Sequence, residues 1–151
     1  MKLSSQKTVD ASIDRVFAAI TEFTAFEVML RERGAHVEQT SGSVPPDVGA
    51  KWKARFKWHE RAYDVQTEMV SVDPGVGYAI ESKGNGIVCM GVVDLEAIDE
   101  RRTRLFVSFD LAATTFASRL LLQTLRLTGA SLNRRLDKRV SAYVERIENK
   151  A

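Results

Sequence analysis

Residues 50–58 alternate between apolar and basic side chains almost without fault, and this alternation constrains the fold more than any other part of the sequence. Successive side chains of a β-strand point to opposite faces, so a period of two predicts a strand with one buried and one solvated face. Such half-buried strands are typical of antiparallel sheets. The buried face is predicted to carry Trp52, Ala54, Phe56 and Trp58, and the solvated face Lys51, Lys53, Arg55 and Lys57.

Further strand-like segments surround this one and are separated by residues typical of turns. Residues 62–72 repeat the alternation, and Asp73-Pro74-Gly75 predicts a turn after them, because proline presets φ and glycine permits a positive φ. Gly84-Asn85-Gly86 predicts a hairpin. Residues 87–95 are apolar on both faces except at Asp94, which favours a central place in the sheet. The other predicted strands cover residues 3–10, 35–41, 77–83, 87–98 and 103–112.

The apolar period changes from two to about 3.6 after residue 114, which indicates a helix. It predicts one helix over residues 115–148, about 51 Å long, in which Gly129 is unfavourable. Two short helices are predicted after the first strand, one capped by Ser12 and one over residues 23–33. A strand, two short helices, a run of antiparallel strands and a long helix define an α+β fold, expected here as a single domain over residues 1–151.

One helix is too narrow to cover a flat sheet of this many strands, so we expect the sheet to curve and to leave space between its concave face and the long helix. Bulky side chains on that face either fill the space as core or line a pocket, and the sequence leaves both readings open. The residues predicted to line a pocket are Phe26, Trp52, Phe56, Trp58, Tyr63, Val65, Met69, Tyr78, Ile80, Leu120, Gln123 and Leu127.

Composition and charge narrow the classes of function. The 151 residues are 44% hydrophobic and 28% charged, as in a globular protein, and the net charge of +2 is too small to indicate a nucleic-acid partner. The single cysteine, Cys89, excludes an internal disulfide and is typical of a reducing compartment. No apolar stretch approaches the roughly 20 residues of a membrane-spanning helix, and the first residues do not resemble a signal peptide. We therefore expect a cytoplasmic protein without a transmembrane segment.

The order of elements, the opening segment, one turn and the long terminal helix resemble the START-like superfamily. The opening segment is Val9-Asp10-Ala11-Ser12-Ile13-Asp14-Arg15-Val16-Phe17, and the turn is Val72-Asp73-Pro74. This superfamily, also called SRPBCC or the birch-pollen-allergen fold, includes polyketide cyclases and proteins similar to a subunit of carbon monoxide dehydrogenase. The resemblance covers essentially the whole chain.

The resemblance implies a helix-grip fold, in which a curved antiparallel sheet of six to seven strands wraps around a long C-terminal helix and a deep cavity lies between them. It implies a hydrophobic ligand such as a lipid, sterol or polyketide, and for some members a cyclisation or dehydration. The family has no universal catalytic motif, so the resemblance assigns no catalytic residue and no cofactor.

The sequence contains few groups suited to catalysis or metal binding. Its two histidines, His36 and His59, stand in no metal-binding spacing, so we expect no metal site. His59 is either a general base near neutral pH or an exposed turn residue, and strand parity favours the turn. Asp110 is an acid or base candidate if it is buried, since desolvation would raise its pKa, and otherwise a solvated residue at a strand end. Polar groups that could orient a ligand are Tyr63, Thr67, Tyr78, Ser108, Asp110 and Gln123.

These observations leave three hypotheses for function. The first is a protein without a cofactor that binds or carries a small hydrophobic or aromatic molecule. The second is a cyclase- or dehydratase-like lyase that uses the same cavity, against which counts the lack of a converging acid and base. The third is an accessory protein that docks through its C-terminal segment, because residues 115–150 carry eight basic and three acidic side chains. A peripheral contact with a membrane and the oligomeric state stay open.

Overall fold

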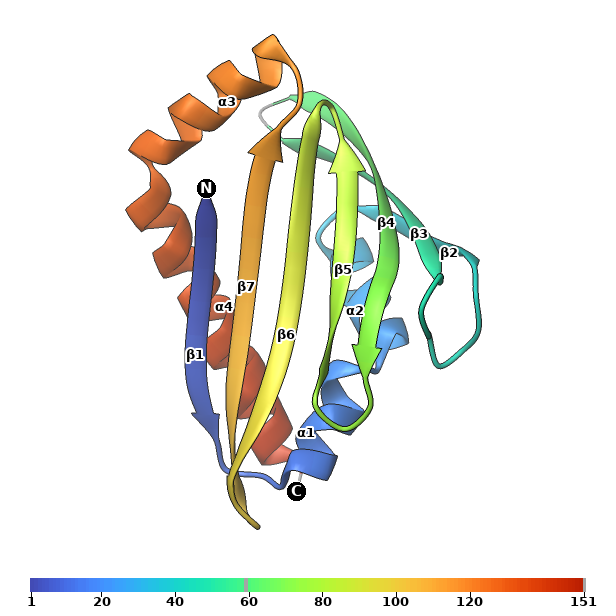
Figure 1. Cartoon of the computed structure of the whole chain (residues 1–151), viewed down its shortest axis with the longest axis vertical. Helices are drawn as coiled ribbons and strands as arrows, with labels where there is room; N and C mark the ends of the chain where they lie inside the picture. Colours follow the sequence, from blue (N-terminus) through green and yellow to red (C-terminus); the bar gives the residue numbers. More distant parts are fainter. Residues whose placement is uncertain (59, 151) are drawn as a thin grey trace.

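The structure is a computed structural model, and it describes residues 1–58 and 60–150. A curved seven-stranded sheet is accompanied by helices, as the predicted α+β class requires (Figure 1). The strands are β1 (Lys2–Val9), β2 (His36–Ser41), β3 (Lys51–Trp58), β4 (Arg61–Asp73), β5 (Gly77–Gly84), β6 (Ile87–Asp99) and β7 (Arg102–Ala113). The helices are α1 (Ile13–Ile20), α2 (Phe23–Glu32), α3 (Phe116–Leu127) and α4 (Gly129–Asn149).

The strands pair only with antiparallel neighbours, in the order β1-β7-β6-β5-β4-β3-β2. Every predicted strand is present, with ends that agree to within one residue. β6 lies between β5 and β7, so the place inside the sheet that its apolar run predicted is confirmed. Figure 1 shows α1, α2 and α4 on one side of the sheet, which we call the concave face.

The two short helices also begin where the sequence predicted. The hydroxyl of Ser12 accepts a hydrogen bond of 3.3 Å from the backbone N–H of Arg15 and so caps α1. Val16 and Ile20 of α1 are buried in the core. α2 follows after a short turn, and Arg31 near its end donates a 2.7 Å hydrogen bond to the carbonyl of Val37 in β2. This contact ties α2 to the edge strand of the sheet.

The prediction of one continuous helix over residues 115–148 is wrong. The chain forms two helices, α3 and α4, which meet at Thr128 and run at an angle to each other (Figure 1). The Thr128 hydroxyl donates a 3.0 Å hydrogen bond to the carbonyl of Leu125 and satisfies part of the end of α3. Threonine and glycine both have low helix propensity, so the Thr128-Gly129 pair is the weakest point of the segment.

α4 lies along β1 and is held there by polar contacts. Asp137 accepts hydrogen bonds from the Ser5 hydroxyl at 2.8 Å and from the Lys7 ammonium at 2.9 Å. The side-chain hydrogen bonds from Lys7 and Ser5 lower the pKa of Asp137. The backbone N–H of Ser4 donates to the Asn133 side chain at 2.9 Å. These contacts cover the free edge of β1 and fix α4 against the concave face.

The closely packed core occupies the end of the concave face near α1. It is built from both short and long elements: the end of β1, α1, the neighbouring parts of the central strands and the second half of α4. Its buried members include Val9, Val16, Ile20, Leu95, Leu105, Val140, Val144 and Ile147. Among the described residues, the end of the sheet near α3 contributes none to this group.

Candidate functional site

Five aromatic side chains form an inner aromatic cluster where α2 and α4 face the sheet. The Phe23 ring lies 5.3 Å from the Trp52 ring and 5.1 Å from the Tyr78 ring, measured between centroids. Phe26 lies 6.0 Å from Phe23 and 5.5 Å from Tyr143 of α4. Rings at these separations attract one another beyond their burial alone. The inner aromatic cluster therefore joins α2, the sheet and α4.

Trp52 is fixed at the centre of this cluster by a polar contact. Its indole N–H donates a 3.0 Å hydrogen bond to a carboxylate oxygen of Glu27, which also lies 3.8 Å from Arg31. Glu27 was not among the residues predicted from the sequence, where its only signal is a position one helical turn before Arg31 on α2. Of the residues predicted to line a pocket, Trp52, Met69 and Tyr78 are buried as core, and Ile80 packs against them.

The Tyr143 hydroxyl is buried and has no hydrogen-bond partner among the residues that the structure describes. Burial, reinforced by the nearby Glu22 carboxylate, raises the pKa of Tyr143 well above its usual value. Burial and the neighbouring Tyr143 likewise raise the pKa of Tyr78. Both phenols therefore stay protonated at neutral pH, so they can donate hydrogen bonds and cannot serve as bases.

Three further aromatic side chains form an outer aromatic trio at the end of the sheet near α3. The Phe56 and Tyr63 rings stack at 5.4 Å with an interplanar angle of 14°, and Trp58 lies 6.2 Å from Tyr63. The Arg61 guanidinium lies 6.0 Å from the Tyr63 ring, within the range of a cation–π contact. Phe56 and Trp58 remain 37% and 38% exposed, whereas Trp52 on the same face of β3 is 6% exposed. The concave face is thus covered at one end and open at the other.

Small polar groups lie on the concave face beside the outer aromatic trio. The hydroxyls of Thr67 and Ser82, on neighbouring strands, are hydrogen-bonded at 2.8 Å. Val65 and Cys89 share this face by register and are half-buried. Burial, together with the charge of Asp110, raises the pKa of Cys89 and keeps its thiol protonated, which is typical of a cysteine that only packs.

Three residues predicted to line the pocket belong to α3 and face away from the sheet. α3 turns its Ser118 and Leu122 side chains inward, where both are buried. Leu120, Gln123 and Leu127 lie on the opposite side of that helix and are exposed. In a straight helix these three residues would also lie about 100° to 160° around the axis from the buried Val140, so the prediction chose the wrong side of the helix.

The predicted position of two polar residues on β7 is also wrong. Leu105 on the concave face is buried, so Ser108 and Asp110, which have the opposite parity, lie on the outer face. The Asp110 carboxylate is exposed and lies 3.9 Å from the N-terminal ammonium group. Asp110 is therefore no longer a candidate acid or base for the space behind the sheet.

The described residues contain no group of three or more His, Cys, Asp or Glu side chains that could hold a metal ion. His36 is exposed at the start of β2, and His59 lies outside the described residues. None of the helices in residues 1–58 and 60–150 is both long and apolar enough to cross a membrane.

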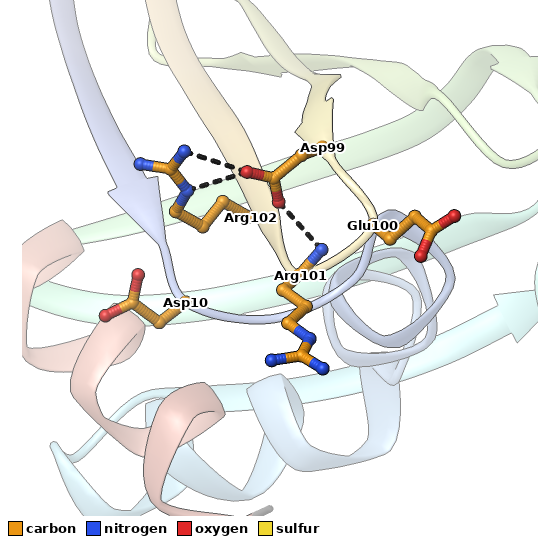
Figure 2. A pocket seen from close by; sticks show the side chains of 5 residues that line it. All are labelled: Asp10, Asp99, Glu100, Arg101 and Arg102. Atoms are coloured by element: carbon orange, nitrogen blue, oxygen red, sulfur yellow. Dashed lines mark hydrogen bonds and ion pairs between the residues drawn. The ribbon is translucent and has the colours of Figure 1, made fainter.

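A separate surface hollow of about 750 Å³ lies at the β6–β7 turn (Figure 2). Arg102 donates two hydrogen bonds, of 2.9 and 2.8 Å, to one carboxylate oxygen of Asp99, and the Arg101 backbone N–H donates to the other oxygen at 2.8 Å. Asp10 and Glu100 complete the lining. These contacts explain the conformation of the turn, and the wall consists of exposed charged residues, so we assign no ligand to this hollow.

Comparisons with known proteins yield structural relatives only. No family model matches the sequence, and no curated protein matches it. The protein TTHA0849 from Thermus thermophilus is similar in structure over 100% of this chain and 99% of its own, with a TM-score of 0.71 and 13% identity. The Zhui aromatase/cyclase from Streptomyces sp. R1128 is similar over 99% of this chain and 94% of its own, with a TM-score of 0.71 and 12% identity.

A third similar structure is a norcoclaurine synthase from Thalictrum flavum, solved as a point mutant with a transition-state analogue. It covers 100% of this chain and 96% of its own, with a TM-score of 0.70 and 14% identity. Structural similarity at identities this low establishes the fold and leaves the activity open. The seven-stranded antiparallel sheet, the paired short helices and the C-terminal helix along the concave face agree with these relatives. The chain therefore has the helix-grip fold of the START-like, or SRPBCC, proteins.

Proposed function

We propose that this protein binds a small, largely apolar ligand with an aromatic ring on the open part of the concave face. The observation that carries the proposal is the contrast along β3. Trp52 is packed into the core, whereas Phe56 and Trp58 on the same face keep more than a third of their surface in water. Aromatic side chains contribute large binding energies when they are buried, so a partly exposed trio on a concave surface is suited to a flat apolar molecule.

The neighbouring polar groups define what else such a ligand would carry. The hydroxyls of Thr67 and Ser82 are hydrogen-bonded to each other at 2.8 Å, yet each hydroxyl can take part in more than one hydrogen bond. One polar substituent on the ligand could therefore be oriented by this pair. The proposed wall keeps four residues of the set predicted from the sequence and adds two hydroxyl residues: Phe56, Trp58, Tyr63 and Val65 are kept, and Thr67 and Ser82 are added.

The structural relatives support an aromatic ligand without defining it. One of them is an aromatase/cyclase, and another norcoclaurine synthase structure is a complex with dopamine and hydroxybenzaldehyde. The latter has a TM-score of 0.68 and is 13% identical to this chain. Those ligands belong to that protein, and here they suggest only the class of molecule to try first.

Phe56→Ala is expected to weaken binding of the fluorescent dye anilinonaphthalene sulfonate about tenfold, because it removes half of the stacked Phe56–Tyr63 pair. The partly exposed position makes a large loss of stability unexpected. Val76→Ala is the matched control, since Val76 is equally exposed but lies at the β4–β5 turn. Unchanged dye affinity in folded Phe56→Ala protein, with or without an effect of the control, would contradict the proposal.

A second candidate function is catalysis on a carbonyl-containing substrate, and one observation favours it. The buried Tyr143 hydroxyl keeps its proton and has no partner among the described residues, which suits a donor to a developing oxyanion. Access to this group would require the aromatic rings around it to shift, because the hydroxyl is fully enclosed.

Tyr143→Phe tests whether this hydroxyl is available. Removing a buried polar atom without a partner is expected to raise the free energy of unfolding by about 1 kcal/mol. Urea denaturation followed by far-ultraviolet circular dichroism measures the change. A loss of stability instead would mean that the Tyr143 hydroxyl already forms a hydrogen bond and is not available to a substrate.

A further inference from the structure

α3 carries apolar side chains on two opposite sides, and only one of them is used by the fold. Leu122 faces inward and is buried. Phe116, Leu120 and Leu127 are spaced so that they fall within an arc of about 40° on the opposite side, which we call the outward face of α3. They are 75%, 49% and 87% exposed. An apolar stripe over three turns of helix is unusual on a protein surface and indicates a contact.

The charge around this stripe has a single sign. Residues 111–136 contain no aspartate or glutamate but four arginines, Arg119, Arg126, Arg134 and Arg135. All four are exposed, and none forms an ion pair with another described residue. Arg119 and Arg126 flank the outward face of α3 on one side, at about 60° to 80° from Phe116. The apolar stripe thus lies within a basic surface.

The fold holds α3 in a defined position, so its exposed face does not reflect a detached segment. The backbone N–H and the hydroxyl of Thr114 donate to the Gly86 carbonyl at 2.8 and 2.9 Å. Thr115 and Ser118 form a reciprocal capping box at the start of the helix. The N-terminus of α3 is therefore fastened to the β5–β6 hairpin.

We propose that the outward face of α3 docks on the surface of an anionic phospholipid bilayer, with α3 lying parallel to the membrane plane. Apolar side chains on one side and arginines beside them are the features of a helix that binds at a lipid interface. Figure 1 places the end of β3 and the start of β4 at the same end of the molecule as α3. The exposed Lys57 at the end of β3 would add a cation.

The charge also favours a lipid surface over a second copy of the chain as the partner of the outward face of α3. Two copies packed through the outward face of α3 would bring two acid-free arginine surfaces together, and like charges oppose such contact. An anionic lipid surface instead attracts each arginine near it. The proposal does not depend on ligand binding by the concave face.

Sedimentation with sucrose-loaded vesicles tests the proposal directly. We expect the protein to bind phosphatidylcholine vesicles that contain phosphatidylglycerol, to bind pure phosphatidylcholine vesicles much less, and to dissociate as NaCl is raised. The combined variant Phe116→Ser and Leu127→Ser should lower the partition coefficient at least about tenfold. Arg119→Gln with Arg126→Gln should lower it about tenfold on anionic vesicles and leave neutral vesicles unaffected.

Matched control variants change similar groups away from α3. Val44→Ser with Val48→Ser removes exposed apolar side chains, and Arg33→Gln with Arg101→Gln removes exposed cations. The proposal fails if the wild-type protein does not sediment with anionic vesicles, or if these controls lose as much binding as the α3 variants. The proposal also fails if the wild-type protein does not bind vesicles and light scattering shows that it is a dimer. In that case the Phe116 and Leu127 substitutions would convert the dimer to a monomer. The arginine variant decides the matter should the serine variant misfold.

Discussion

Replacing Trp52 with alanine should lower the free energy of unfolding by about 3 to 5 kcal/mol, the usual cost of deleting a large buried aromatic side chain. Trp52 is 6% exposed and touches Phe23 of α2, while its own strand pairs with β2 and β4. The substitution would open a cavity between α2 and the sheet. Little side-chain material is free to collapse into it, because Phe23 is also held by Tyr78.

Losing the polar contact of Trp52 lowers the free energy of unfolding further. Without the indole N–H, the largely buried Glu27 carboxylate loses a hydrogen bond of 3.0 Å and keeps only the longer contact with Arg31. Trp52→Phe isolates this part, since it retains much of the ring volume and should cost about 1 to 3 kcal/mol. Glu27→Gln on the wild-type background keeps an acceptor for the indole and should cost less than Trp52→Phe.

Urea denaturation monitored by circular dichroism measures these changes, and the second tryptophan provides the control. Trp58 lies on the same face of the same strand but is 38% exposed, so Trp58→Ala should cost clearly less than Trp52→Ala. Equal losses at the two positions would mean that the contrast along β3 is false. In that case the distinction between a packed inner cluster and an open outer trio, and with it the proposed ligand site, would not hold.

The strands were predictable because each leaves its own local signal. The side chains of residues 50–58 alternate with the pleat, and that pattern alone placed Trp52 and Phe56 on one face. The Asp73-Pro74-Gly75 and Gly84-Asn85-Gly86 turns then set the lengths of the strands beside them. An antiparallel meander follows from such local signals, since consecutive strands pair with their sequence neighbours from β2 to β7.

The depth of burial along one face was not predictable from the same signals. Period two says which face Trp52 and Phe56 share, but the difference between them depends on α2, which covers only the first. Glu27 was missed for a related reason, because its partner lies 25 residues away in sequence. Contacts of this kind depend on how a helix is laid over the sheet, and no short-range pattern encodes that.

The C-terminal segment combines two separate errors, the missed break and the choice of the wrong inward side. The Thr128-Gly129 pair breaks the segment into two helices, but even a straight helix would have put Leu120 and Leu127 about 140° to 160° from the buried Val140. Leu122 shares the inward side and is buried, whereas Leu120 and Leu127, predicted as cavity wall, are exposed. Gly129 was recognised as unfavourable within a helix, but its ordinary propensity cost of about 1 kcal/mol is too small to predict a break by itself.

Gly77→Ala should be the other severely destabilising change, with an expected cost of about 3 kcal/mol or more. A β-carbon on Gly77 would lie 2.1 Å from the backbone carbonyl oxygen of Val93 and 2.8 Å from the Asp94 carboxylate. The carboxylate can rotate away, but the carbonyl belongs to the adjacent strand β6 and can move only with it. The next residue is Tyr78, so a displaced β5 also disturbs the inner aromatic cluster.

Gly129→Ala is the same chemical change, but we expect it to raise the stability. Nothing lies within 4 Å of the position a β-carbon would take there, and Gly129 is the first residue of α4. Alanine should therefore raise the stability by about 0.4 to 1 kcal/mol through the unfolded chain and helix propensity. Thermal unfolding of both variants distinguishes the two cases. A Gly77→Ala protein as stable as wild type would show that β5 and β6 are not in the close contact described, and the register on which the concave face depends would have to be revised.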